Sequence, residues 1–189
     1  MTIGNSANTT ALSNGTNAFG QSFINDTNGS ASPILLNDWT FMVSDFIPPF
    51  TNNPISGLVT LSIYAGTGIG GTLIGSTTTY TTAGSGNSST ATWTFAGGLS
   101  LIDNQTYTAA VSSSLTSLNF RTSSANPYAN GILTRSISGD LTGSDTVFTA
   151  NFSAGATAVP FEFETTSGLA ILGGAWLLRR HLKNRTKKA

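Results

Sequence analysis

The feature that most constrains this chain is the recurrence of apolar residues at every second position in short segments between Ala18 and Phe152. Such alternation is typical of β-strands that bury one face. Five segments predict these inward-facing residues: Trp39, Phe41 and Val43; Val59, Leu61 and Ile63; Ala91, Trp93 and Phe95; Tyr107, Ala109 and Val111; and Phe148, Ala150 and Phe152. A helical period of useful length is missing from the sequence before Thr165.

Clusters of Gly, Pro, Asn and Asp separate these segments, for example Pro48-Pro49, Gly97-Gly98 and Asn126-Pro127. Gly reaches positive φ and Pro fixes φ, so such clusters favour turns. Many short strands joined by turns predict an all-β protein with an antiparallel β-sandwich, which we expect to be jelly-roll-like. We place this single domain at residues 18–154, after a polar segment at 1–17.

One glycine-rich stretch, Gly66-Thr67-Gly68-Ile69-Gly70-Gly71, matches the G-x-G-x-x-G pattern of dinucleotide sites. That pattern needs a following helix and an acidic residue about 20 positions on. Here a Thr-rich, strand-like segment follows, and the next acidic residue is Asp103. We therefore interpret the stretch as a hairpin turn.

Charge is divided sharply along the chain. Two basic residues, Arg121 and Arg135, stand against eight acidic ones up to Glu164, and six basic residues follow with no acidic one. An anionic body is a poor match for nucleic acid, which we exclude as a partner. Only 8% of residues are charged, so hydroxyl and amide groups solvate the surface, which suits an exported body. There is no Cys, so neither a disulfide framework nor thiolate chemistry is available.

The end of the chain predicts a membrane anchor. An uncharged run at 165–178 precedes a basic tail at 179–189, the order of a transmembrane helix with a cytoplasmic tail and an external body. The predicted anchor residues are Leu169, Ile171, Leu172, Trp176, Leu177 and Leu178. The predicted positive-inside stop consists of Arg179, Arg180, Lys183, Arg185, Lys187 and Lys188.

This anchor is short. Fourteen residues of helix span about 21 Å, less than the ~30 Å hydrocarbon core, which leaves a soluble or interfacial helix as an alternative. Flanking Arg side chains extend the effective span, and Gly173 and Gly174 are typical of membrane helices. Apolar residues cover every side, so a membrane span is favoured.

Just before the anchor stands Val159-Pro160-Phe161-Glu162-Phe163-Glu164, within a linker at 155–164. A Pro-containing motif, a brief apolar helix and a terminal basic cluster together resemble the PEP-CTERM sorting signal of bacterial exosortase substrates. The motif is similar to the Pro-Phe-Glu variant of cyanobacterial surface proteins. This resemblance implies that Pro160, Phe161 and Glu162 are read by an exosortase-like peptidase in the membrane, which processes the chain near the motif and releases or transfers the body. A plain tail anchor without processing is the alternative.

The first residues, Met1 to Thr16, lack a basic and apolar export signal. A signal peptide missing from this sequence, a misplaced start codon and an unusual export route all fit, and we favour the first two. The body also resembles, in texture only, carbohydrate-binding-like surface modules.

Candidate chemistry in the body is sparse. The only histidine, His181, lies in the basic tail, so neither a nucleophilic triad nor a His or Cys metal site is expected. Asp26, Asp140 and Asp145 lie in oxygen-rich loops that could hold calcium, although solvated turn carboxylates are the favoured interpretation. For stacking on a sugar, Tyr128 is the better surface candidate, and Trp93 is assigned to the core.

We therefore expect a non-catalytic, single-pass surface or extracellular-matrix protein without a cofactor. Its expected partners are the membrane and an exosortase-like peptidase. A carbohydrate-binding module that acts on extracellular polysaccharide is the alternative. A hydrolase that uses Asp38, Asp45 or Asp103 is least favoured, since nothing pairs these acids in sequence.

Overall fold

The computed structural model describes residues 1–6, 11–14, 18–25, 33–45, 55–83, 89–113, 118–123, 126–135 and 143–155. The chain divides into two compact units, Met1–Ala156 and Thr157–Ala189, and every described residue belongs to the first. The predicted sorting motif, anchor helix and basic tail lie outside the described residues. Within the described ranges, no helix has the length and apolar character needed to cross a bilayer.

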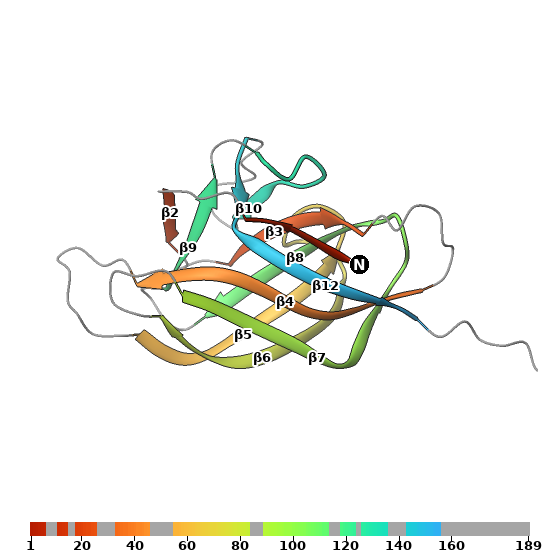
Figure 1. The fold of residues 1–189 in the computed structure, drawn as a ribbon, viewed down its shortest axis with the longest axis horizontal. Coiled ribbons are helices and arrows are strands. Elements are labelled where there is room, and N and C mark those ends of the chain that lie inside the picture. The colour runs from red at the N-terminus through yellow and green to blue at the C-terminus, as the bar shows by residue number, and fades with distance from the viewer. Residues whose placement is uncertain are drawn as a thin grey trace, which may run out of the picture. The chain divides into compact units, whose positions relative to one another are not determined.

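Strands of the described body form two antiparallel sheets, so the prediction of an all-β, sandwich-like body is confirmed (Figure 1). Sheet A contains β1 Thr2–Asn5, β2 Ala11–Asn14, β4 Ile34–Asp45, β7 Ser89–Leu101, β9 Leu118–Ser123, β11 Asp145–Thr146 and β12 Phe148–Ala154. Sheet B contains β3 Phe19–Ile24, β5 Ile55–Ala65, β6 Leu73–Ala83, β8 Thr106–Ser113 and β10 Leu133–Arg135.

Strand β4 organises sheet A. It pairs with β12 on one side and β7 on the other, and Figure 1 shows the three running side by side. In this register Trp39 lies opposite Ala150 of β12 and Trp93 of β7. Because side chains alternate across a strand, this register sends the large apolar residues of all three strands to the same face.

The predicted inward-facing residues form the core. All fifteen side chains named from the period-two pattern are buried. Strand β8 departs from the expectation, since its outward Thr108 and Ala110 are buried as well. The Thr108 hydroxyl donates to the Gly66 carbonyl at 2.8 Å, and a satisfied hydroxyl can be buried at little cost.

The glycine-rich stretch is the predicted hairpin turn. It joins β5 to β6, and Gly66 and Gly68 have φ of 83° and 88°, values that L side chains rarely adopt. The backbone N–H of Ala65 donates to the Thr72 carbonyl at 2.9 Å and closes the turn. No helix follows, so the requirement for a dinucleotide site is not met here.

The sheet begins before Ala18, where we had predicted the domain boundary. Strand β1 pairs with β12 from Thr2↔Asn151 to Asn5↔Phe148, and β2 pairs with β9. The polar composition of residues 1–17 obscures these strands, because backbone pairing at a sheet edge needs no apolar side chain. The compact unit accordingly starts at Met1.

Candidate functional site

Three fully buried polar residues, Gln21, Asp145 and Thr146, form a hydrogen-bonded group inside the body, here called the polar cluster. Gln21 Nε2 donates to Asp145 Oδ1 at 2.8 Å. Gln21 Oε1 accepts two hydrogen bonds from Thr146, one from the backbone N–H at 2.8 Å and one from the hydroxyl at 3.0 Å. Every polar atom of the glutamine amide is thus engaged with the last part of the sandwich.

Packing between the two sheets brings the polar cluster together. Gln21 comes from β3 of sheet B, where it alternates with the buried Phe19 and Phe23 and so faces the interior. Asp145 and Thr146 come from β11 of sheet A, paired with Ser123 and Thr122 of β9. Gln21 and Thr146 were not among the site residues predicted from the sequence. The Phe-x-Gln-x-Phe alternation was the available signal for Gln21.

Asp145 is a buried carboxyl group held by neutral donors. Its Oδ2 accepts the backbone N–H of Tyr128 at 2.8 Å, and its Oδ1 accepts from Gln21. Burial raises the pKa of Asp145 above its ordinary value, and the two hydrogen bonds oppose this shift only in part. Asp145 therefore becomes protonated at a higher pH than an exposed aspartate does.

The interpretation of Asp145 as a solvated turn carboxylate is wrong, because its side chain is 0% exposed and each of its oxygens accepts a hydrogen bond from a protein N–H group. Asp26 and Asp140 lie outside the described residues. In the ranges that the structure describes, no group of three or more His, Cys, Asp or Glu side chains could hold a metal ion.

Tyr128 is not the free sugar-stacking surface that we predicted. Its ring meets Phe148 edge-on, with 5.3 Å between centroids and an interplanar angle of 89°. Its hydroxyl donates to the Ile24 carbonyl at 3.0 Å and accepts from the Ile24 N–H at 3.2 Å. Burial raises the pKa of Tyr128, which keeps the phenol protonated. Trp93 is in the core, as predicted.

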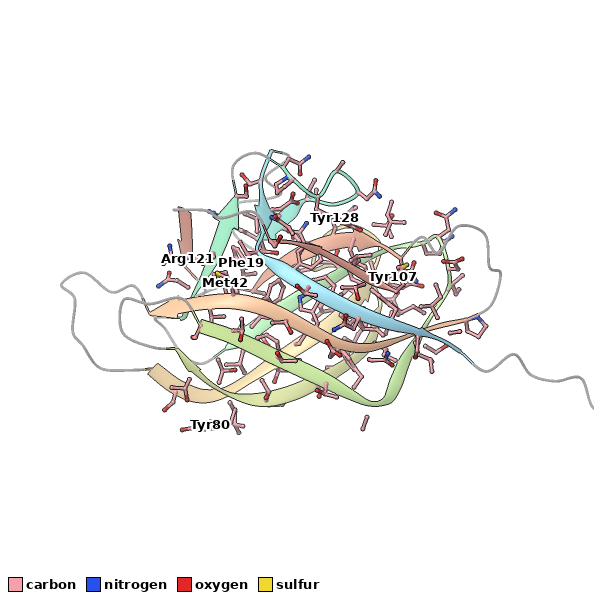
Figure 2. All side chains as sticks on the ribbon, viewed as in Figure 1. Phe19, Met42, Tyr80, Tyr107, Arg121 and Tyr128 are labelled. Atoms are coloured by element: carbon pink, nitrogen blue, oxygen red, sulfur yellow. The ribbon has the colours of Figure 1, made fainter. Side chains whose placement is uncertain are left out.

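The outer face of β5 and β6 presents a second kind of surface. Cross-strand pairs there are Leu58↔Tyr80, Thr60↔Thr78 and Ser62↔Ser76. Leu58 and Tyr80 are each 66% exposed, and Figure 2 shows Tyr80 projecting away from the body, whereas Tyr107 lies within it. Neither strand contains a charged residue, so this face is neutral, with hydroxyl groups beside an exposed aromatic ring.

The outer face of sheet A carries side-chain hydrogen bonds across four strands. Thr2 Oγ1 donates to Asn151 Oδ1 at 2.8 Å, and Asn151 Nδ2 donates to Asp38 Oδ1 at 2.7 Å. Thr40 and Thr92 hydroxyls are 2.8 Å apart. Asp38 thus accepts a hydrogen bond from the Asn151 amide as part of a surface network. This partner is an amide and not a second carboxyl group, which a hydrolytic acid pair would need.

Comparison of the chain with models of known protein families, with curated protein sequences and with solved structures found no match. The sorting residues Pro160, Phe161 and Glu162, the anchor residues and the basic stop lie outside the described residues. The described geometry therefore concerns the body alone.

Proposed function

We propose that this chain is a non-catalytic surface or extracellular-matrix protein, whose jelly-roll-like body is carried outside the cell and held by a C-terminal membrane helix. The observation that carries the proposal is the order of a Pro-Phe-Glu motif, an uncharged run and a basic cluster at the end of the chain. In this proposal Pro160, Phe161 and Glu162 are read by an exosortase-like peptidase in the membrane.

The body is compatible with this role. The last described strand, β12, ends at Ala154, five residues before Val159 in the sequence. Among the described residues, Asp145 is fully buried, and its two carboxylate oxygens accept hydrogen bonds from Gln21 and Tyr128. The outer face of β5 and β6 is rich in hydroxyl groups, and neither strand contains a charged residue.

Cell fractionation tests the proposal. The complete gene is expressed in a bacterium that has an exosortase-like peptidase, beside a chain truncated after Glu164 and the double variant Pro160→Ala, Glu162→Ala. We expect the complete chain either in the membrane fraction or, after trimming, outside the cell. The truncated chain should be found neither in the membrane fraction nor in a trimmed form. Pro127→Ala, at an exposed position between strands, is the matched control and keeps the wild-type distribution. An intact, untrimmed chain in the aqueous fraction refutes the proposal.

A second candidate, binding of a neutral polysaccharide, is favoured by the outer face of β5 and β6. An exposed Tyr ring can stack on a sugar face, and the hydroxyl groups of Thr60 and Thr78 can hydrogen-bond to it. The lack of charge on these strands favours an uncharged glycan over an anionic one.

Pull-down on insoluble cellulose and on β-glucan tests this candidate with the full chain. We expect Tyr80→Ser to reduce the bound fraction, while Ile102→Ser, which removes an equally exposed apolar side chain outside these strands, leaves it unchanged. Equal binding by wild type and Tyr80→Ser removes the support for this face.

A further inference from the structure

We propose that Thr146 and Gln21 become joined by an ester bond in the folded chain, through a reaction that the protein carries out on itself. The bond would link Thr146 Oγ1 to Gln21 Cδ, with ammonia as the leaving group. This inference rests on the polar cluster alone and holds whether or not the chain is exported.

The two reacting groups already touch. Thr146 Oγ1 lies 3.0 Å from Gln21 Oε1, and Cδ is one bond away from Oε1. A small rotation of either side chain brings the hydroxyl oxygen to attack distance from Cδ, about 3–3.5 Å. Because folding holds both groups in this contact, the attack is intramolecular and avoids the entropic cost of an encounter.

The site also provides a donor for the charge that develops on the amide oxygen. When the hydroxyl adds to Cδ, the carbonyl electron pair moves onto Oε1. The backbone N–H of Thr146 points at this oxygen from 2.8 Å and is fixed by the strand. A preformed donor at this position stabilises an oxyanion.

Asp145 is placed to move the proton. Its Oδ1 is 2.8 Å from Gln21 Nε2, the atom that must leave. In the tetrahedral adduct the protonated carboxyl gives its proton to Nε2, and the Cδ–Nε2 bond then breaks with its electron pair on nitrogen, releasing NH₃. The proton of the Thr146 hydroxyl returns to the carboxylate, so atoms and electrons balance without an oxidant or a co-reactant.

The environment suits both formation and survival of the ester. Gln21, Asp145 and Thr146 are all 0% exposed, so water is excluded from hydrolysing the product. The raised pKa of Asp145 makes the proton-donating form accessible. Lysine occurs only at 183, 187 and 188, so the body has no lysine for an amide cross-link, and a hydroxyl nucleophile is the available route.

The bond would tie sheet B to sheet A near opposite ends of the body sequence. The two residues are 125 positions apart, so the covalent loop encloses most of the sandwich. A cross-link over such a long loop restricts the unfolded chain strongly, as a disulfide would. For a chain without cysteine this is an alternative covalent brace.

Mass spectrometry tests the proposal on the purified, folded full-length chain in mild detergent. We expect an intact mass lower than the sequence mass by one ammonia molecule. Trypsin cleaves the denatured body after Arg121 and Arg135, so the peptides 1–121 and 136–179 should remain joined. Hydroxylamine cleaves esters and, among peptide bonds, Asn–Gly, so it should release 136–179 from the Gln21 fragment; its cuts at Asn14-Gly15 and Asn28-Gly29 do not by themselves break that link.

Variants identify the atoms. Thr146→Val should keep the full sequence mass, and Thr146→Ser, which retains the nucleophile, should lose ammonia again. Asp145→Asn should lose ammonia more slowly. Thr108→Val removes another fully buried threonine hydroxyl and should behave as wild type. A folded wild-type chain that retains the full mass, with peptides 1–121 and 136–179 separate, overturns the proposal. So does ammonia loss in folded Thr146→Val.

Discussion

Two regions of the interior are equally closed to solvent and are held by different forces. In the first, here called the aromatic cluster, Trp39 stacks on Phe148 with 4.7 Å between centroids, and Phe23 of the opposite sheet lies 4.8 Å from Trp39. In the second, the polar cluster, Gln21, Asp145 and Thr146 are held by hydrogen bonds at 2.8–3.0 Å. Tyr128 touches both, with its ring on Phe148 and its N–H on Asp145.

The difference shows what burial means for each type of side chain. The aromatic cluster gains free energy from the area that it removes from water and from close packing, so it tolerates changes that conserve volume. The polar cluster gains little from burial itself, and its stability depends on each donor finding an acceptor. Removing one member of the polar cluster therefore leaves partners unsatisfied, whereas removing a ring leaves a cavity.

Substitutions in the two clusters separate the contributions of their noncovalent contacts to stability. Each substitution is made in a chain that also carries Thr146→Val, which cannot form the proposed ester and serves as the reference.

The largest effect is expected from Phe148→Ala. Phe148 is 2% exposed and contacts Trp39 and Tyr128, so truncation leaves a cavity and lowers the free energy of unfolding by about 3–5 kcal/mol. Urea denaturation followed by tryptophan fluorescence measures it. Phe148→Leu, which keeps most of the volume, should cost clearly less. Equal losses for the two variants would mean that packing volume does not control this cluster.

Asp145→Ala should follow, at about 1–3 kcal/mol, because Gln21 Nε2 and the Tyr128 N–H lose their acceptor in the interior. Relief of the buried carboxyl group offsets part of that loss. Asp145→Asn retains an acceptor and the volume, so urea denaturation should find it closer to the reference chain. An alanine variant as stable as the reference contradicts a role for matched donors.

Tyr128→Phe should cost less, about 0.5–1.5 kcal/mol, since it removes only the hydroxyl that bonds both backbone groups of Ile24. Tyr80→Phe is the matched control: its hydroxyl meets Ser56 on the surface, and its loss should lie within about 0.5 kcal/mol of zero. Thermal unfolding by circular dichroism gives both values. A larger loss for Tyr80 would reverse the assignment of interior and surface.

The last contrast is one of slope with pH. Because the pKa of Asp145 is raised in the folded chain, the folded state binds this proton more tightly than the unfolded state. Its contribution to stability is therefore fully present below the ordinary pKa of 3.8 and is lost as pH rises through the raised value. We measure the free energy of unfolding by urea denaturation at a series of pH values from about pH 3 upward, where carboxyl groups titrate. The value for the reference chain minus the value for Asp145→Asn should decrease as pH rises. A difference that rises with pH contradicts it.

Much of the body could be predicted because its signals are local. Alternation placed Trp39, Val59 and Phe148 in the core, and the glycine-rich stretch after Ala65 was correctly assigned as a turn. The burial of Asp145 could not be predicted in this way. A lone Asp in a Ser- and Gly-rich segment has the sequence context of an exposed turn, and its acceptor role depends on Gln21, 124 positions away.

Sequence alone thus determined one inward face for five strands, those that carry Trp39, Val59, Trp93, Val111 and Phe148, since side-chain direction in a strand follows from position and needs no partner. It also supplies the order of motif, uncharged run and basic cluster on which the proposed sorting signal depends. Only the tertiary structure decided that Gln21 of one sheet meets Asp145 and Thr146 of the other. The physical reason is that hydrogen bonds act over about 3 Å, so their partners exist only once the two sheets have packed.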